Sequence, residues 1–212
     1  MQKLKIAFSE KINSNDPIEK ISVHLDSCQR HLIENVPWPA YPYHPEVYFA
    51  IAHSGNCISL KFYVEENFIK AATGSINGPV WEDASVEFFI SFAEKGYYNF
   101  EFNCIGTALA GFGKEKNNRE LLTEEVINKI NYEAVIRNSK KNKLISWELT
   151  LKIPVGVFIH HHISSLHEKK CSANFYKCGD HLPEPHFIAW ANIQSPEPNF
   201  HLPEFFGELE FE

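Results

Sequence analysis

The stretch GPVWEDASVEFFIS, residues 78–91, places an aromatic ring beside several carboxylates. Trp81 follows a Gly-Pro turn, and Glu87 stands in the alternating, aromatic-rich segment after it. The next such segment, GYYNFEFN, contributes Glu101 and Asn103. An indole ring can stack on the apolar face of a pyranose, and carboxylate and amide oxygens accept hydrogen bonds from its hydroxyl groups. These residue types therefore predict a carbohydrate site.

Glu87 and Glu101 are also the candidate pair for general acid/base catalysis. In the hairpin expected below they are diagonal cross-strand neighbours, roughly 7–8 Å apart. Inverting glycosidases hold their carboxyl groups roughly 6.5–9.5 Å apart. Two glutamates on one face of a strand pair are nevertheless common and carry no catalytic signature. We expect a non-catalytic protein, with glycoside hydrolysis as the alternative.

The two segments predict a β-hairpin over residues 85–92 and 97–104. A three-residue loop, 94–96, would end in a left-handed Gly96 next to a bulge. Ala93 then pairs with Tyr97, which sets Glu87 opposite Asn103. Because side chains alternate along a strand, one face is mixed and is expected to meet solvent. That face carries Glu87, Phe89, Glu101 and Asn103. The opposite face is apolar and belongs between two sheets.

The rest of the chain supplies short strand patterns separated by turn residues. Strands are expected over 21–25, 47–53, 57–66, 107–113, 131–138, 146–154, 170–178, 186–193 and 207–212. Segment 37–46 holds four prolines and is expected to be an extended loop. Residues 119–130 form the best helix pattern. The elements predict an all-β fold, an antiparallel, jelly-roll-like β-sandwich with one or two short helical insertions, in a single domain over residues 1–212.

Composition limits the classes of partner. A net charge of −7 argues against nucleic acid or an anionic membrane. No stretch reaches the ~18 apolar residues that a membrane span requires. The first residues lack a signal-peptide pattern, and five irregularly spaced cysteines favour reduced thiols. We expect a cytoplasmic protein, or a secreted one if the amino terminus is trimmed.

GPVWEDASVEFFIS and GYYNFEFN together resemble the carbohydrate-binding modules of family 9. The closing stretch FIAWANIQSPEPNFHLPEFFGELEF and the preceding CSANFYKCGD are similar to that family's last motifs. The resemblance covers roughly residues 45–212, with 114–145 unmatched. It implies a β-sandwich that binds the end of a sugar chain without catalysis, usually beside a glycosidase domain that degrades polysaccharides.

The resemblance also assigns site residues. The ligand lies between two tryptophans in the family; Trp81 occupies one of these positions and Phe200 the other. The strand glutamate that accepts hydroxyl hydrogen bonds corresponds to Glu87. An arginine and an asparagine on the next strand correspond to Glu101 and Asn103. The change from arginine to Glu101 reverses a charge, and with Phe200 it leaves open a sandwich that has lost sugar binding and contacts proteins instead.

Metal binding has only weak support from the sequence. Members of the family often bind structural calcium through oxygen ligands, but no loop here has the run of acidic residues that this needs. The histidines of IHHHISSLH, residues 159–167, do not match zinc spacing and are expected to be solvated or partly packed. No other cofactor is expected, and the sequence does not predict the oligomeric state.

Overall fold

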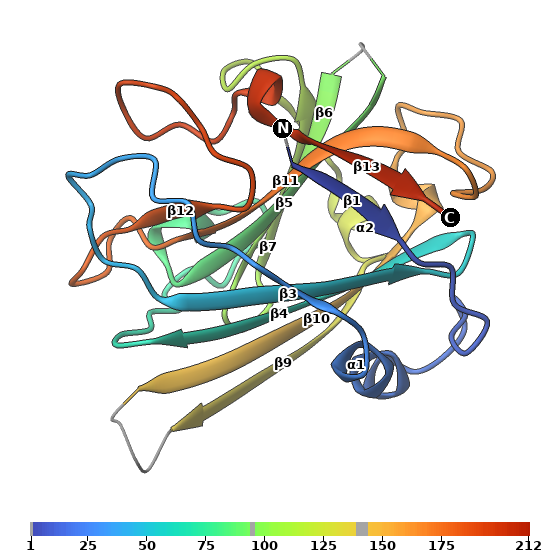
Figure 1. Ribbon diagram of the computed structural model, residues 1–212, viewed down its shortest axis with the longest axis horizontal. Helices are drawn as coiled ribbons and strands as arrows, with labels where there is room; N and C mark the ends of the chain where they lie inside the picture. Colours follow the sequence, from blue (N-terminus) through green and yellow to red (C-terminus); the bar gives the residue numbers. More distant parts are fainter. Residues whose placement is uncertain (1, 94–95, 139–143) are drawn as a thin grey trace.

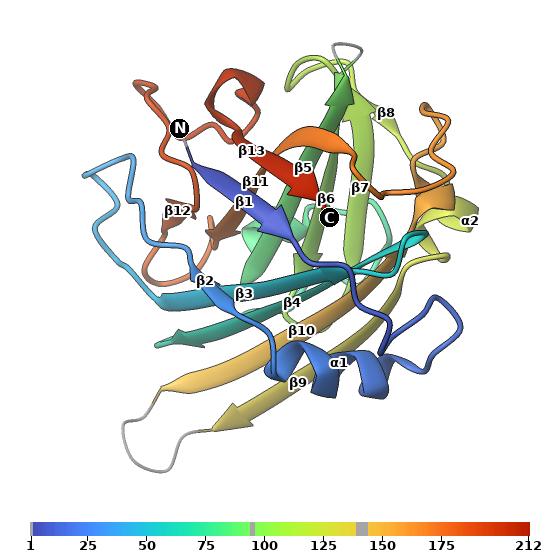
Figure 2. The ribbon, with the colours of Figure 1, turned by 45° about the vertical axis from the view of Figure 1, so that its right-hand side comes forward.

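The computed structural model describes residues 2–93, 96–138 and 144–212, which form two β-sheets packed face to face (Figures 1 and 2). Two short helices, α1 (Ile18–Asp26) and α2 (Glu124–Ile127), accompany the strands. Three 3₁₀ turns, Val80–Glu82, Val155–Val157 and Pro203–Phe205, lie in the connections. The predicted β-sandwich with short helical insertions is confirmed. No helix in the described ranges is long and apolar enough to cross a membrane.

The larger sheet carries the predicted site hairpin at its centre. Its strands run in the order β1 (Lys3–Ile6), β13 (Gly207–Phe211), β11 (Lys170–Cys178), β5 (Ser85–Ala93), β6 (Gly96–Asn103), β7 (Ala108–Gly113) and β8 (Glu120–Leu121), with β12 (Phe187–Ala189) paired to the end of β11. Strands β1 and β13, which carry the two termini, pair in parallel (Figure 1). The sequence analysis predicted antiparallel pairing throughout, and this parallel pair departs from that prediction.

The smaller sheet has the order β2 (Arg30–Leu32), β3 (Glu46–His53), β4 (Cys57–Glu66), β10 (Ile145–Pro154) and β9 (Asn131–Asn138). The strands predicted over 47–53 and 57–66 pair as β3–β4, and those predicted over 131–138 and 146–154 pair as β9–β10. The turn of the second pair falls on residues 139–143, outside the described residues. The short strands β1 and β2 were not predicted, because three or four residues carry too little alternation to be recognised.

Aromatic and aliphatic side chains fill the space between the sheets. The ring of Phe175 on β11 stacks on Phe49 of β3 at 3.8 Å between centroids and on Phe88 of β5 at 5.0 Å. All three residues are fully buried. These rings join the centres of the two sheets and so fix the strand that carries Glu87.

Helix α1 replaces the strand predicted over residues 21–25. Ile21 and Leu25 are buried, whereas Val23 between them is 71% exposed. The segment thus has the four-residue spacing of a helix rather than the two-residue alternation of a strand. Its apolar side packs on Ala50 and Ala52, on the outer face of the smaller sheet. Small side chains on β3 let the helix approach the sheet. This is a tertiary contact, so the local sequence pattern of residues 21–25 did not indicate it.

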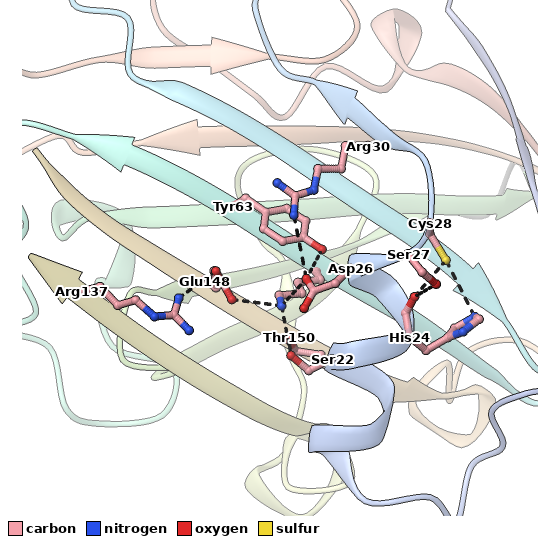
Figure 3. Close-up of polar contacts among 11 residues, drawn as sticks. Ser22, His24, Asp26, Ser27, Cys28, Arg30, Tyr63, Arg137, Glu148 and Thr150 are labelled. Atoms are coloured by element: carbon pink, nitrogen blue, oxygen red, sulfur yellow. Dashed lines mark hydrogen bonds and ion pairs between the residues drawn. The ribbon is translucent and has the colours of Figure 1, made fainter. Parts of the chain in front are cut away.

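A buried lysine ties α1 to this outer face (Figure 3). Lys61 on β4 is 1% exposed, and its Nζ lies 2.7 Å from Asp26 Oδ1 and 3.0 Å from Glu148 Oε2. It also donates to Ser22 Oγ at 3.1 Å, while Tyr63 donates its hydroxyl to Asp26. All three N–H groups of the ammonium therefore have acceptors, as a buried charge requires.

The helix predicted over residues 119–130 is mostly absent. Its first part forms β8, and Leu122 donates its backbone N–H to Ala110 O on β7. Thr123 then caps the four-residue helix α2 by accepting from the N–H of Val126. The apolar residues that suggested a helix are divided between β8, α2 and the connections beside them.

The register of the β5–β6 hairpin differs from the prediction. Glu87 pairs with Glu101, not with Asn103, and Ala93 pairs with Gly96. A register shift lies between Ile90 and Ala93, and Gly96 has the expected positive φ of 135°. The loop residues 94–95 lie outside the described residues. Because the error amounts to two residues, each side chain keeps its predicted face.

The predicted solvent exposure of the mixed face is wrong. Glu87, Phe89, Glu101 and Asn103 are each at most 4% exposed. Strand β12 ends at Ala189, and the chain beyond it crosses this outer face instead of extending the strand to residue 193 as predicted. Buried there against Phe89 are Trp38, Ile193, Phe200 and Phe206. A second, smaller apolar layer thus covers the larger sheet from outside.

Candidate functional site

A cavity of about 300 Å³ opens where this cover meets the outer face of the larger sheet. Its floor comes from strands β5, β6, β7 and β11, and its walls from β8, β12 and four loops. The lining residues are Trp81, Glu87, Asn99, Glu101, Leu109, Lys116, Arg119, Leu121, Cys178, Asp180, Phe187, Pro198, Asn199, Phe200 and His201. Four of the five predicted site residues therefore line one cavity. The fifth, Asn103, does not.

Glu87 and Glu101 stand side by side on the floor, because the observed register places them directly opposite each other. Each is 4% exposed. Glu87 Oε1 accepts from the thiol of Cys178 at 3.2 Å, and Glu101 Oε1 accepts from Asn99 Nδ2 at 2.8 Å. Burial raises the pKa of Glu87 well above its ordinary value, and the neighbouring Glu101 raises it further. Burial likewise raises the pKa of Glu101 to about 7. The pair therefore retains protons to a higher pH than two exposed glutamates would.

Arg119, which the sequence did not identify, reaches the floor from the loop between β7 and β8. Its Nε donates to Asn99 Oδ1 at 2.9 Å, and its Nη2 donates to Tyr97 O at 2.8 Å. Its guanidinium lies 4.2 Å above the Tyr97 ring. The arginine thus orients Asn99, whose amide in turn orients Glu101. Nothing in the local sequence signals this role, because a loop brings Arg119 to the site.

Trp81 forms part of the wall and is 38% exposed. It lies in the 3₁₀ turn Val80–Glu82, and its carbonyl accepts from the N–H of Asp180 at 3.2 Å. Two residues further on, Asp83 is fully buried and accepts from the backbone N–H groups of Ala72 and Thr73. Asp83 thus fixes the loop that carries Trp81.

Phe200 lines the cavity but is only 8% exposed. Its ring stacks on Tyr176 with 4.1 Å between centroids and 8° between planes, and Tyr176 donates its hydroxyl to Phe200 O at 3.1 Å. One ring face is therefore occupied by the protein. Phe200 therefore anchors the cover and also lines the cavity.

Asn103 holds the loop instead of facing the cavity. It is fully buried, and its Nδ2 donates to Asp83 Oδ2 at 3.0 Å and to Thr73 O at 2.9 Å. Its Oδ1 accepts from the N–H of Thr107 at 2.9 Å. The sequence correctly placed Asn103 beside Glu101 on one face, but its polar atoms support Trp81 indirectly.

No cluster of three or more His, Cys, Asp or Glu side chains suited to a metal ion occurs in the described part of the chain. His160 packs on Phe112 with 4.2 Å between ring centroids, and Tyr98 O–H lies 3.0 Å from His161 Nδ1. Calcium also takes backbone carbonyl ligands, so the structural calcium implied by the resemblance stays a prediction. All five cysteines are unpaired.

Fold and cavity together define a β-sandwich with a ligand-sized pocket on the outer face of one sheet. The model of the family described as "Carbohydrate-binding family 9" matches residues 19–211, so the chain belongs to that family. The search of curated proteins returned no match.

Solved structures agree with this assignment. A putative carbohydrate-binding protein from Bacteroides uniformis is 38% identical, with a TM-score of 0.92, over 100% of this chain and 99% of that one. A family 9 module from Caldicellulosiruptor kristjanssonii in complex with glucose gives a TM-score of 0.61 at 8% identity, over 100% of this chain and 96% of that chain. The structure of such a module with cellotriose gives 0.64, also at 8% identity, over 100% and 94%. The latter two likenesses concern the fold.

Proposed function

We propose that this protein binds the end of a saccharide chain, or a small free saccharide, without chemical turnover. The observation that carries the proposal is the single cavity that brings Trp81 and Phe200 together with Glu87 and Glu101. At about 300 Å³ it is at the small end of the range of ligand pockets. Such a volume suits one terminal sugar residue better than a long segment of chain.

The side chains divide the recognition between them. Trp81 offers the accessible aromatic surface for the apolar face of a sugar ring. Glu87 and Glu101 accept hydrogen bonds from hydroxyl groups, and Phe200 closes the far wall. By analogy with stacked bases, an aromatic contact of this type contributes roughly 1–3 kcal/mol. With so few contacts, we expect dissociation constants in the micromolar range or weaker, on the order of 10⁻⁶ M or above.

Intrinsic fluorescence tests the proposal directly, because Trp81 is the exposed tryptophan. The other three, Trp38, Trp147 and Trp190, are at most 5% exposed. A sugar that enters the cavity should therefore change the emission of Trp81 and leave the rest unchanged. Glucose and cello-oligosaccharides are the first ligands to titrate, because the C. kristjanssonii modules were solved with glucose and cellotriose.

Trp81→Ala should weaken sugar affinity roughly tenfold or more in calorimetry, since it removes the stacking surface. Phe68→Ala is the matched control: Phe68 is 43% exposed and does not line the cavity. Unchanged affinity in Trp81→Ala would refute the stacking role. Absence of binding by any saccharide would favour a sandwich that contacts proteins instead.

Glycoside hydrolysis is the second candidate, and the observed register is the reason to test it. Glu87 and Glu101 face each other directly, and retaining glycosidases hold their carboxyl groups roughly 5–5.5 Å apart. Turnover of aryl glycosides that is lost in Glu87→Gln would establish an enzyme. We propose binding alone because burial disfavours the ionised form of both carboxyl groups, whereas a retaining glycosidase needs one ionised nucleophile.

A further inference from the structure

The cavity contains buried carboxyl groups that lack a cationic partner. Within residues 2–93, 96–138 and 144–212, no ion pair involves Glu87, Glu101 or Asp180, although all three line the cavity. The second oxygen, Oε2, of both Glu87 and Glu101 accepts no hydrogen bond from a described residue. Both side chains are 96% buried yet open into the cavity, so their free oxygens point to a ligand that donates to them.

The donors already present stabilise the ionised form of these glutamates only weakly. Glu87 receives only a thiol, which is a weak donor, and Glu101 receives a neutral amide. Arg119, the nearest arginine, has its Nε, Nη1 and Nη2 engaged by Asn99 Oδ1, Glu115 O and Tyr97 O. It lies close enough to favour ionised Glu101, but it makes no ion pair with it within 4.0 Å.

A neutral sugar meets only part of this need. A hydroxyl group donates a single hydrogen bond and brings no charge, whereas an ammonium group brings three N–H donors and a positive charge. One ammonium placed over the facing pair can therefore donate to both glutamates at once. The wall supplied by Trp81 suits such a ligand too, because an indole face attracts a cation.

We propose that the preferred ligand is a saccharide end that carries a free, protonated amine, that is, an amino sugar whose nitrogen is not acylated. This inference rests on the proposed sugar-binding function and narrows its substrate class. The ammonium sits over Glu87 and Glu101, within reach of Asp180, while the ring stacks on Trp81. The groups that face the pair from the surrounding elements are Lys116, Arg119, Tyr97, Tyr176, Cys178, Asp180 and His201.

Calorimetry at about pH 7, where the amine is largely protonated, tests the proposal. The ligands are glucosamine, galactosamine and mannosamine, each compared with its parent hexose and its N-acetyl derivative. At least one amine should bind roughly tenfold tighter or more than both of its neutral partners, as expected for a charge-assisted contact. Glu87→Gln and Glu101→Gln should each abolish most of this preference, measured as the ratio of the affinity for the amine to the affinity for the parent hexose.

Lys116→Gln gives an independent readout. Lys116 is an exposed cation at the rim of the cavity, so its removal should increase the preference for the amine. Equal affinity for amine and hexose would overturn the inference and leave the sugar-binding function intact. Tighter binding of glucuronic acid than of any amine would also overturn it. If no sugar in the panel binds, both the inference and the proposed function fail.

Discussion

Replacing Glu101 with Gln removes one titratable group from the buried pair while keeping the size of the side chain. The amide oxygen of glutamine can still accept the hydrogen bond that Asn99 donates. The substitution therefore isolates the cost of ionising a carboxyl group at this position. We predict that it changes how stability depends on pH more than it changes the fold.

The sign and size follow from the raised pKa. In the folded protein burial lifts the pKa of Glu101 from its ordinary 4.5 to about 7. Between these values the folded state binds more protons than the unfolded state, so the free energy of unfolding falls as pH rises through this window. A shift of this size corresponds to about 3 kcal/mol, which the wild-type protein loses between about pH 4.5 and pH 7. The repulsion that Glu101 exerts on Glu87 acts in the same direction.

Urea denaturation at about pH 5 and about pH 8 measures the effect. Glu101→Gln should be more stable than the wild-type protein at the higher pH by about 2.5 kcal/mol, relative to their difference at the lower pH. Glu65→Gln is the matched control, because Glu65 is an exposed glutamate on β4 and should show no such divergence. If the difference between Glu101→Gln and wild type is the same at both pH values, burial does not hold this carboxyl neutral and the reasoning fails.

Two further predictions concern the supports of the site and of the fold. Asp83→Ala should lower the free energy of unfolding by about 2–4 kcal/mol in urea denaturation, because it leaves buried donors without an acceptor. It should also weaken sugar binding in the fluorescence titration through the loosened loop of Trp81; unchanged stability and affinity would contradict the role assigned to Asp83. Ile21→Ala should cost about 2–5 kcal/mol and Val23→Ala less than about 0.5 kcal/mol, because the first side chain is buried under α1 and the second is exposed. Equal losses would contradict the helical face observed for this segment.

Local alternation predicted which side chains share a face, and it did so correctly for the β5–β6 hairpin. It did not predict the register, because a bulge between Ile90 and Ala93 shifts the pairing and leaves no trace in the alternation. Nor did it predict burial. Phe89 shares its face of the hairpin with Glu87 and Glu101, and only the return of the distant Phe200 and Phe206 explains why this face is closed.

Site residues that lie on distant loops are harder to predict from the sequence than those on the strands. The family resemblance identified Trp81, Phe200, Glu87 and Glu101, and the structure places all four around one cavity. Arg119 fell within a segment interpreted as a helix, and no spacing rule connects it to Asn99. The family resemblance places an arginine at the position of Glu101. In this protein Arg119, from a different part of the chain, supplies a cation nearby.

The position of the paired glutamates bears on why the cavity exists. Two facing carboxyl groups under an apolar cover cost stability that a pair of leucines would not, because their charged forms are desolvated and repel each other. The cover is held by contacts that do not involve them, such as the stack of Phe200 on Tyr176. Since neither sheet pairing nor core packing needs these carboxyl groups, a ligand that donates to them explains why glutamates occupy the cavity floor.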